Sequence, residues 1–241
     1  MLYCLFAYAP DAAMLRMVCA RLRYLDPEAT IYIISDPEHP VDSAAIPGEG
    51  IHHRMGHTKR GGNLNGLHIV GEEIATYKAL MELHGAEHIV KLDADCYPLR
   101  WDALCDTTQP GDFVCCERWQ AFVPSGMAYT LSLRMANALL ELYNARTAGK
   151  LWQPGQLWQE DITLWALACQ TGLPVRMLPY MGGYAASMPD ILPHEVPQNV
   201  LSAHFIHCGE PTADGRRIPR EHATLRMRIL ESTMDEFRRT K

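Results

Sequence analysis

The segment 88–98, HIVKLDADCYP, constrains the fold of this chain more than any other. Its nearly continuous apolar run predicts a strand buried on both faces, as in a parallel sheet covered by helices. Residues i and i+2 share one side of a strand, so Asp93 and Asp95 can converge at its C-terminal end. Ligands of open α/β sheets bind at that end, where two carboxylates suit a divalent cation and a diphosphate. The alternative is an exposed Asp pair in a turn.

Strand-like and helix-like patterns alternate through the first half of the chain. This β-α-β-α-β order predicts an α/β fold with a Rossmann-like, mostly parallel central sheet flanked by helices. We expect strands at 2–8, at 31–36 and up to the Asp93/Asp95 pair, helices at 12–24 and 71–83, and a loop over 37–53.

The second half is organised differently. We expect strands at 113–116 and 175–178, a segment at 122–132 that runs through a Pro/Gly turn, helices at 133–144 and 160–170, and another apolar run at 200–207. Gly172 is placed to end the second of these helices.

Composition excludes some partners. The net charge of −6 gives no overall attraction to nucleic acid, so nucleic acid is not an expected partner. The eight cysteines form no Cys-x-x-Cys pair, which favours a reduced, cytoplasmic protein. The apolar segment 1–10 has no basic residue before it and is interpreted as a strand rather than a signal peptide.

Three further features carry candidate chemistry. Glu160 and Asp161 begin a predicted helix, where they either do chemistry or only cap the helix. His204 and His207 end an apolar run, where either imidazole is a possible metal ligand or a strand-edge side chain. The Gly-rich segment 59–65, KRGGNLN, could hold phosphate oxygens, or be a solvated loop.

In this order, the features resemble the GT-A class of nucleotide-sugar glycosyltransferases. Segment 91–97, KLDADCY, matches the Asp-x-Asp motif that follows a strand, and segment 160–164, EDITL, matches an acidic Glu-Asp-hydrophobic element. Segment 126–132, GMAYTLS, resembles the Gly-x-x-Tyr-x-x-Ser element of fringe-like and β-1,3-galactosyltransferase-like enzymes. The resemblance covers most of residues 1–209.

The resemblance implies a metal-dependent transferase that moves a sugar from a nucleotide diphosphate, UDP by resemblance, to an acceptor hydroxyl. It implies Mn²⁺ or Mg²⁺ bound by Asp93 and Asp95 with His207 or His204, and Asp161, or second Glu160, as general base of an inverting enzyme. In a retaining enzyme those two carboxylates would position hydroxyls instead. The expected donor contacts are Ala7, Tyr8, Asp36, Arg60, Lys78 and Asp93.

Two other functions fit the same residues. A metal-dependent nucleotidyl- or phosphotransferase could also use Asp93 and Asp95. A non-catalytic nucleotide-sugar-binding module would bind the donor without turning it over. The acceptor, whether glycan, lipid or another polyol, is not specified by any motif.

The expected domain organisation is one catalytic domain over 1–215, with a nucleotide-binding half at 1–100 and an acceptor-binding half at 101–215. Residues 216–241 form a basic tail with helical periodicity. Such a helix either packs on the domain or contacts an anionic membrane surface peripherally.

Overall fold

The computed structural model describes residues 1–7, 9–57, 66–98, 111–118, 123–148, 160–178, 183–185 and 202–206. The helices are η1 (Ala9–Asp11), α1 (Ala12–Leu25), η2 (Ser43–Ala45), α2 (Gly66–His84), α3 (Leu133–Ala148) and α4 (Glu160–Gln170). The strands are β1 (Leu2–Ala7), β2 (Thr30–Ser35), β3 (Ile51–Met55), β4 (His88–Asp93), β5 (Cys96–Pro98), β6 (Phe113–Arg118), β7 (Val123–Ser132), β8 (Val175–Leu178), β9 (Gly183–Ala185) and β10 (Ser202–Ile206).

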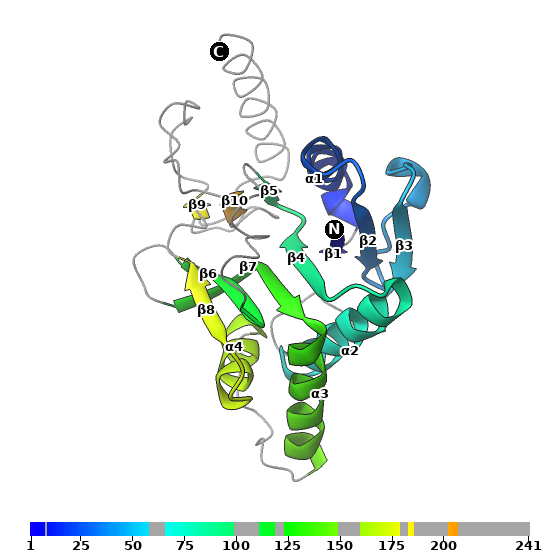
Figure 1. Cartoon of the computed structure of the whole chain (residues 1–241). Helices are drawn as coiled ribbons and strands as arrows, with labels where there is room; N and C mark the ends of the chain where they lie inside the picture. The colour runs from blue at the N-terminus through cyan, green and yellow to red at the C-terminus, as the bar shows by residue number, and fades with distance from the viewer. Residues whose placement is uncertain are drawn as a thin grey trace, which may run out of the picture.

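Seven strands form the central sheet in the order β3-β2-β1-β4-β7-β6-β8. Only β7 runs against its neighbours, since β4 and β6 both pair with it antiparallel while the other four pairings are parallel. The expected α/β fold with a mostly parallel sheet flanked by helices is confirmed. The second, three-stranded sheet has the order β5-β10-β9 and lies beyond the end of β4 (Figure 1).

Helices cover both faces of the central sheet (Figure 1). Alternate side chains of β1 separate the two cores: Tyr3, Leu5 and Ala7 pack with α1, whereas Leu2, Cys4 and Phe6 pack with α2, α3 and α4. All six residues of β1 are buried, as expected for a central parallel strand. The second core continues on β4 through Ile89, so Lys91 and Asp93, which share its side of the strand, face α2 and α4.

Several sequence expectations need correction. The expected loop over 37–53 contains the start of β3, whose mixed residues Ile-His-His-Arg-Met pair with β2 as an edge strand. The expected Pro/Gly turn in 122–132 is one ten-residue strand, β7, whose pairing with β6 is irregular: Cys115 pairs with Tyr129 and Cys116 with Ser125, so residues 126–128 are extra on β7. Helix α2 begins at Gly66 rather than at residue 71. Gly172 does follow α4 with a positive φ of 72°, which confirms it as the helix end.

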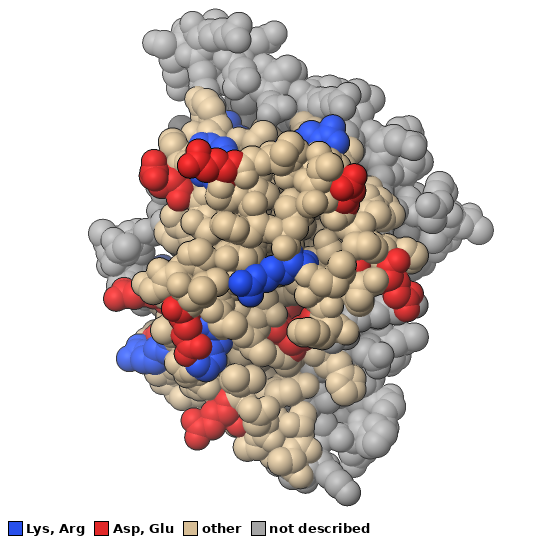
Figure 2. Space-filling view, turned by 90° about the vertical axis from the view of Figure 1, so that its right-hand side faces the viewer, with Lys and Arg blue, Asp and Glu red and all other residues tan. Residues whose placement is uncertain are grey.

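The edge that carries β3 is the face shown in Figure 2, where acidic and basic side chains are scattered among uncharged atoms. This view shows no basic patch. None of the helices among the described residues is both long and apolar enough to cross a membrane. The tail at 216–241 and the domain boundaries given above lie wholly or partly outside the described residues, and they stay predictions.

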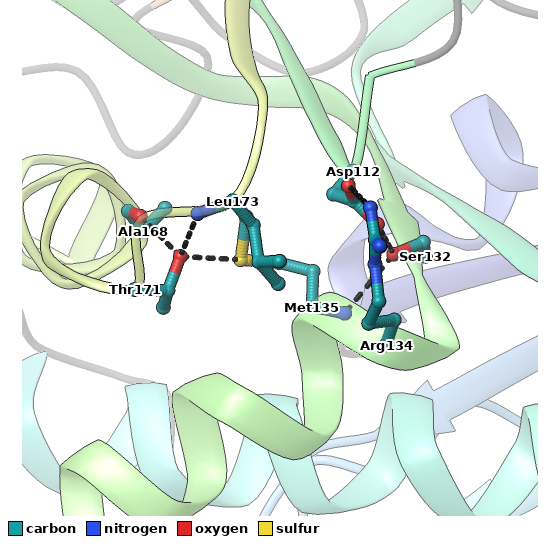
Figure 3. Close-up of polar contacts among 7 residues, drawn as sticks. All are labelled: Asp112, Ser132, Arg134, Met135, Ala168, Thr171 and Leu173. Carbon is teal, nitrogen blue, oxygen red and sulfur yellow. Dashed lines mark hydrogen bonds and ion pairs between the residues drawn. The ribbon is translucent and has the colours of Figure 1, made fainter.

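A cluster of polar side chains holds the start of α3 (Figure 3). It lies at the end of the sheet where β4 begins, since Ser132 pairs with His88. Ser132 is the N-cap: its Oγ accepts a hydrogen bond from Met135 N at 3.0 Å and donates one to Asp112 Oδ1 at 2.6 Å. Arg134 Nε donates to the same carboxylate at 3.0 Å. Hydrogen bonds from Arg134, which outweigh burial, lower the pKa of Asp112 below its ordinary value.

We expect Ser132→Ala to lower the free energy of unfolding by about 1 to 2 kcal/mol, because it removes the helix cap and one donor to Asp112. Urea denaturation measures this. Thr147→Ala is the matched control at the exposed end of the same helix, and we expect it to change stability by less than about 0.5 kcal/mol. Equal losses in the two variants would contradict the assigned cap.

Candidate active site at the ends of β1 and β4

The site lies where the strand order of the sheet reverses. The chain passes from β1 to β2 on one side, and β4 is added on the other side of β1. Ligands of open α/β sheets bind outside the carboxyl ends of the strands at such a point. The register pairs Phe6 with Asp93, so the ends of β1 and β4 are level with each other. Whatever follows either strand therefore faces the same space.

Three carboxylates meet there. Asp93 is the last residue of β4. Asp95 lies in the two-residue turn between β4 and β5, so the strand that was expected to include both acids ends at Asp93. Asp11 follows β1 through η1 and is the N-cap residue of α1. Its carboxyl is buried, with 6% exposed. Burial first, and then the charges of Asp95 and Asp93, raise its pKa to about 8.

Sequence reasoning missed Asp11 as a site residue. The available signal was an acid four residues after the apolar segment 2–7, near the end of a predicted buried strand. The charges of Asp93 and Asp95 raise the pKa of Asp11, an effect that separate exposed acids in turns would not have on one another.

The small sheet brings the C-terminal histidines toward the same turn. β10 pairs antiparallel with β5, with Ala203 opposite Tyr97 and His204 opposite Cys96, the residue after Asp95. Beyond this pair, β10 continues to Ile206 in the direction of Asp95. His204 is thus placed beside the Asp-x-Asp turn by its backbone, whereas His207 lies outside the described residues.

A buried cation lies behind Asp93. Lys91 Nζ donates to Asp93 Oδ1 at 2.5 Å, and the Lys91 side chain is 1% exposed while that of Asp93 is 34% exposed. Burial alone would lower the pKa of Lys91, but Asp93, Glu160 and Glu73 outweigh it and raise the pKa above its ordinary value. The neighbouring carboxylates therefore favour the charged form of Lys91, and the Asp93 side chain stays partly exposed to solvent.

The first turn of α4 carries Glu160 and Asp161, as the sequence predicted. Asp161 Oδ1 accepts a hydrogen bond from Ile162 N at 2.8 Å, which satisfies one of the free N–H groups of the helix start. Glu160 acts electrostatically on Lys91, so the helix start and the end of β4 share one electrostatic environment.

Of the remaining predicted donor contacts, some lie at the strand ends near the site and one lies away from it. Ala7 ends β1, and its carbonyl accepts from Asp36 N at 2.9 Å; Asp36 Oδ1 in turn accepts from Glu38 N at 2.8 Å and His39 N at 3.1 Å. Lys78 lies in the second half of α2, ion-paired with Glu82, on the side where β4 begins, so it is not brought to Asp93. Tyr8 and Arg60 lie outside the described residues.

The donor set suits a hard divalent cation, because carboxylate oxygens are the preferred protein ligands of Mg²⁺ and Mn²⁺. Within the described part of the chain, no group of three or more His, Cys, Asp or Glu side chains has an arrangement that could hold a metal. A complete site built on Asp93 and Asp95 therefore needs a further ligand. A cavity of about 420 Å³ between α1 and the loop before β3, lined by Arg16, Arg23 and Pro47, contains none of the predicted site residues.

The comparisons with known proteins find a likeness of fold to solved structures. No protein-family model matches the chain, and no curated protein matches it. The fold is similar to a crystal structure of the galactosyltransferase LgtC in complex with donor and acceptor sugar analogs, with a TM-score of 0.49, 10% identity, and 95% of this chain and 96% of that chain covered. A likeness at this level identifies no residues or activity, so the function is proposed below from the geometry of the site.

Asp11 makes the stability of the metal-free protein depend on pH. Its folded-state pKa is about 8 and that of an unfolded Asp is about 4, so the folded state binds the extra proton between these values and stability falls as the pH rises through this window. We expect Asp11→Asn, which mimics the protonated acid, to lose this fall.

The measurement is the unfolding midpoint of both proteins at pH 5 and pH 8 in a chelating buffer. The wild type should lose more stability than Asp11→Asn between the two pH values. Parallel pH profiles would show that the Asp11 carboxyl is not crowded by Asp93 and Asp95.

Proposed function

We propose that this chain is a divalent-metal-dependent glycosyltransferase of the GT-A type, with a nucleotide diphosphate sugar, UDP-linked, as donor. The observation that carries the proposal is the meeting of Asp11, Asp93 and Asp95 at the carboxyl ends of β1 and β4. A site with this much negative charge at the nucleotide-binding end of the sheet favours a cation together with its phosphate ligand.

The proposed ligands for Mn²⁺ or Mg²⁺ are Asp95 and Asp93, with His207 or His204 completing the set. The register of β10 against β5 supports the histidine assignment, because it directs the chain toward the Asp95 turn. When bound, the cation would neutralise the charge that develops on the diphosphate leaving group as the sugar–phosphate bond breaks.

Other residues of this chain would hold the donor. Ala7, Tyr8 and Asp36 follow the first two strands and would frame the base and ribose. The hydrogen bonds from Glu38 N and His39 N hold the Asp36 carboxylate at the end of β2. Of the two cations considered for the phosphates, Arg60 keeps this role, because Lys78 is paired with Glu82 on the far half of α2.

Asp161 is the proposed general base. An acceptor hydroxyl is a weak nucleophile near neutral pH, and a carboxylate within hydrogen-bond reach of it accepts its proton as the new bond forms. Asp161 belongs to the first turn of α4, which packs on β7 and α2. A basic tail that contacts membranes stays a prediction for residues 216–241.

Metal and donor binding is tested by thermal unfolding with Mn²⁺ and a panel of nucleotide diphosphates and their sugars. A ligand at 100 times its dissociation constant stabilises the native state by about 2.7 kcal/mol, and we expect this shift for UDP or a UDP-sugar with Mn²⁺. Asp95→Asn should abolish it. Asp112→Asn, which changes a carboxylate at the opposite end of the strands, should keep the shift.

No shift with any nucleotide in the wild type would contradict the proposal. A shift with a donor that is never turned over would instead favour the non-catalytic binding module. Release of phosphate or of diphosphate without sugar transfer would favour the phosphotransferase or nucleotidyltransferase.

Asp161→Asn should lower kcat for release of the nucleoside diphosphate from the donor by about 10²- to 10⁴-fold, because it removes the base that activates the attacking hydroxyl or water. The nucleotide-dependent thermal shift should persist, since Asp161 does not hold the donor in this proposal. Unchanged turnover in Asp161→Asn would exclude it as the general base.

A further inference from the structure

The cavity between α1 and the loop before β3 has the size of a ligand site. Its volume is about 420 Å³, and small-molecule sites in proteins span roughly 300 to 1,000 Å³. One wall is the face of α1 that carries Arg16, Ala20 and Arg23, which are spaced i, i+4 and i+7 and so lie on one side of the helix. The opposite wall comes from segment 46–51. The cavity is therefore separate from the candidate active site.

The guanidinium of Arg23 is held in place by backbone carbonyls. Its Nη1 donates to the carbonyl of Pro27 at 2.7 Å, and its Nη2 donates to the carbonyl of Glu49. Gly50 makes this close approach possible, because a Cβ at that position would overlap Nη2 of Arg23. The φ of Gly50 is also positive, at 64°, which favours glycine. The loop before β3 is thus built around this guanidinium.

Arg16 borders the cavity about two helical turns away from Arg23. Its Nε donates to the carbonyl of Ala45 at 3.1 Å, which anchors the side chain to the opposite loop, and its two terminal nitrogens donate to none of the described residues. Among the described residues, no ion pair joins either arginine to a carboxylate. Glu49 lines the cavity, but it contacts Arg23 through its backbone carbonyl. Both guanidiniums therefore keep a positive charge that no described side chain neutralises.

The wall between the two arginines is uncharged. Ala20 contributes a single methyl group from α1, and Ile46, Pro47 and Ile51 supply apolar surface from the loop. Cys19 completes the α1 side of the cavity. Burial raises the pKa of its thiol to about 12, so the thiol is neutral near pH 7. The cavity thus combines positive charge at its ends with an apolar middle.

This combination suits an organic anion. A guanidinium donates in a planar fork that matches the oxygens of carboxylate and phosphate groups. The whole chain has a net charge of −6, so it does not attract anions in general, and their binding depends on the local pair of cations. The apolar wall favours a ligand whose body also leaves water. Because Arg23 already donates to two carbonyls, Arg16 is the residue with donors available for the ligand.

We propose that this cavity binds a small organic anion, with a carboxylate or phosphate group attached to a compact apolar body. Arg16 binds the oxyanion. Arg23 holds the loop in place and adds positive charge, while the apolar body of the ligand contacts Ala20 and segment 46–51. The site is distinct from the proposed active site and does not depend on the proposed function.

Titration calorimetry of the protein in a chelating buffer tests this site, with phenyl phosphate, benzoate and inorganic phosphate as probes. At least one of the two aromatic anions should saturate a single site per chain, with a dissociation constant at or below about 1 mM. The tighter of the two identifies the oxyanion as phosphate or carboxylate. Inorganic phosphate lacks an apolar body and should bind about tenfold more weakly than the tighter aromatic anion.

Three variants locate the bound anion. Arg16→Gln should weaken the tighter aromatic anion by about tenfold or more, because it removes a charge-assisted hydrogen bond. Ala20→Phe fills the space between the arginines and should abolish binding. Arg54→Gln is the matched control: it removes the same charge from an exposed arginine of β3 that lies over the Tyr32 ring, on the α2 side of the sheet. It should change the affinity by less than about twofold.

Several outcomes would overturn the proposal: no saturable binding of either aromatic anion by the wild type, equal losses in Arg16→Gln and Arg54→Gln, or equal affinity for inorganic phosphate. If Ala20→Phe lowers the unfolding midpoint, Arg16→Gln decides alone. Asp95→Asn should bind the aromatic anion as the wild type does, and loss of binding there would move the anion to the active site and overturn the proposal. Absence of nucleotide or Mn²⁺ binding contradicts the proposed function alone and leaves this titration unaffected.

Discussion

The parallel pairing of β1 with β4 is the constraint on which the site depends. Phe6 and Asp93 lie opposite each other, so η1 after β1 and the turn after β4 leave the sheet at the same level. Asp11 belongs to the first of these departures and Asp95 to the second. A shift of the register by one residue would separate Asp11 from Asp93 and Asp95, because it reverses the facing of every side chain on the strand. The apolar residues of β1 and β4 thus determine where the carboxylates meet.

The same pairing explains how the small sheet is attached. β5 continues from β4 after only two residues, Cys96 is buried in the core under α1, and Arg21 Nε of α1 donates to the carbonyl of Pro98 at 3.0 Å. β5 is therefore held against α1 at both ends, and β10 pairs with it at a fixed register. This pairing places His204, more than a hundred positions further along the chain, next to the Asp95 turn.

Much of this architecture could be predicted from the sequence, and the exceptions have physical causes. Strand β4 and its terminal acids were visible because a buried strand shows a continuous apolar run. β3 was missed because an edge strand needs no such run, and Ile-His-His-Arg-Met has no clear alternation. The antiparallel direction of β7 has no local sequence signal, since direction is set by the pairing partners. Asp11 and Glu73 acquire their roles only from the elements that fold against them.

Lys91 is a sequence signal that the apolar pattern of β4 does not explain. A lysine inside an apolar strand is a clear anomaly, because Lys is almost never fully buried without a partner, and this alone would have justified a search for one. Asp93 pairs directly with this ammonium, Glu160 and Glu73 act on it electrostatically, and Asp11 and Asp95 add to the negative charge at the strand ends. Apolar residues of similar size at these positions would spare the fold that desolvation and repulsion. The chain instead keeps a charged cluster in its central sheet, at the ends of the two neighbouring strands β1 and β4. Crowded charge of this kind is unfavourable for folding but suited to binding a cation and its anionic ligand, because binding relieves the repulsion that the fold imposes.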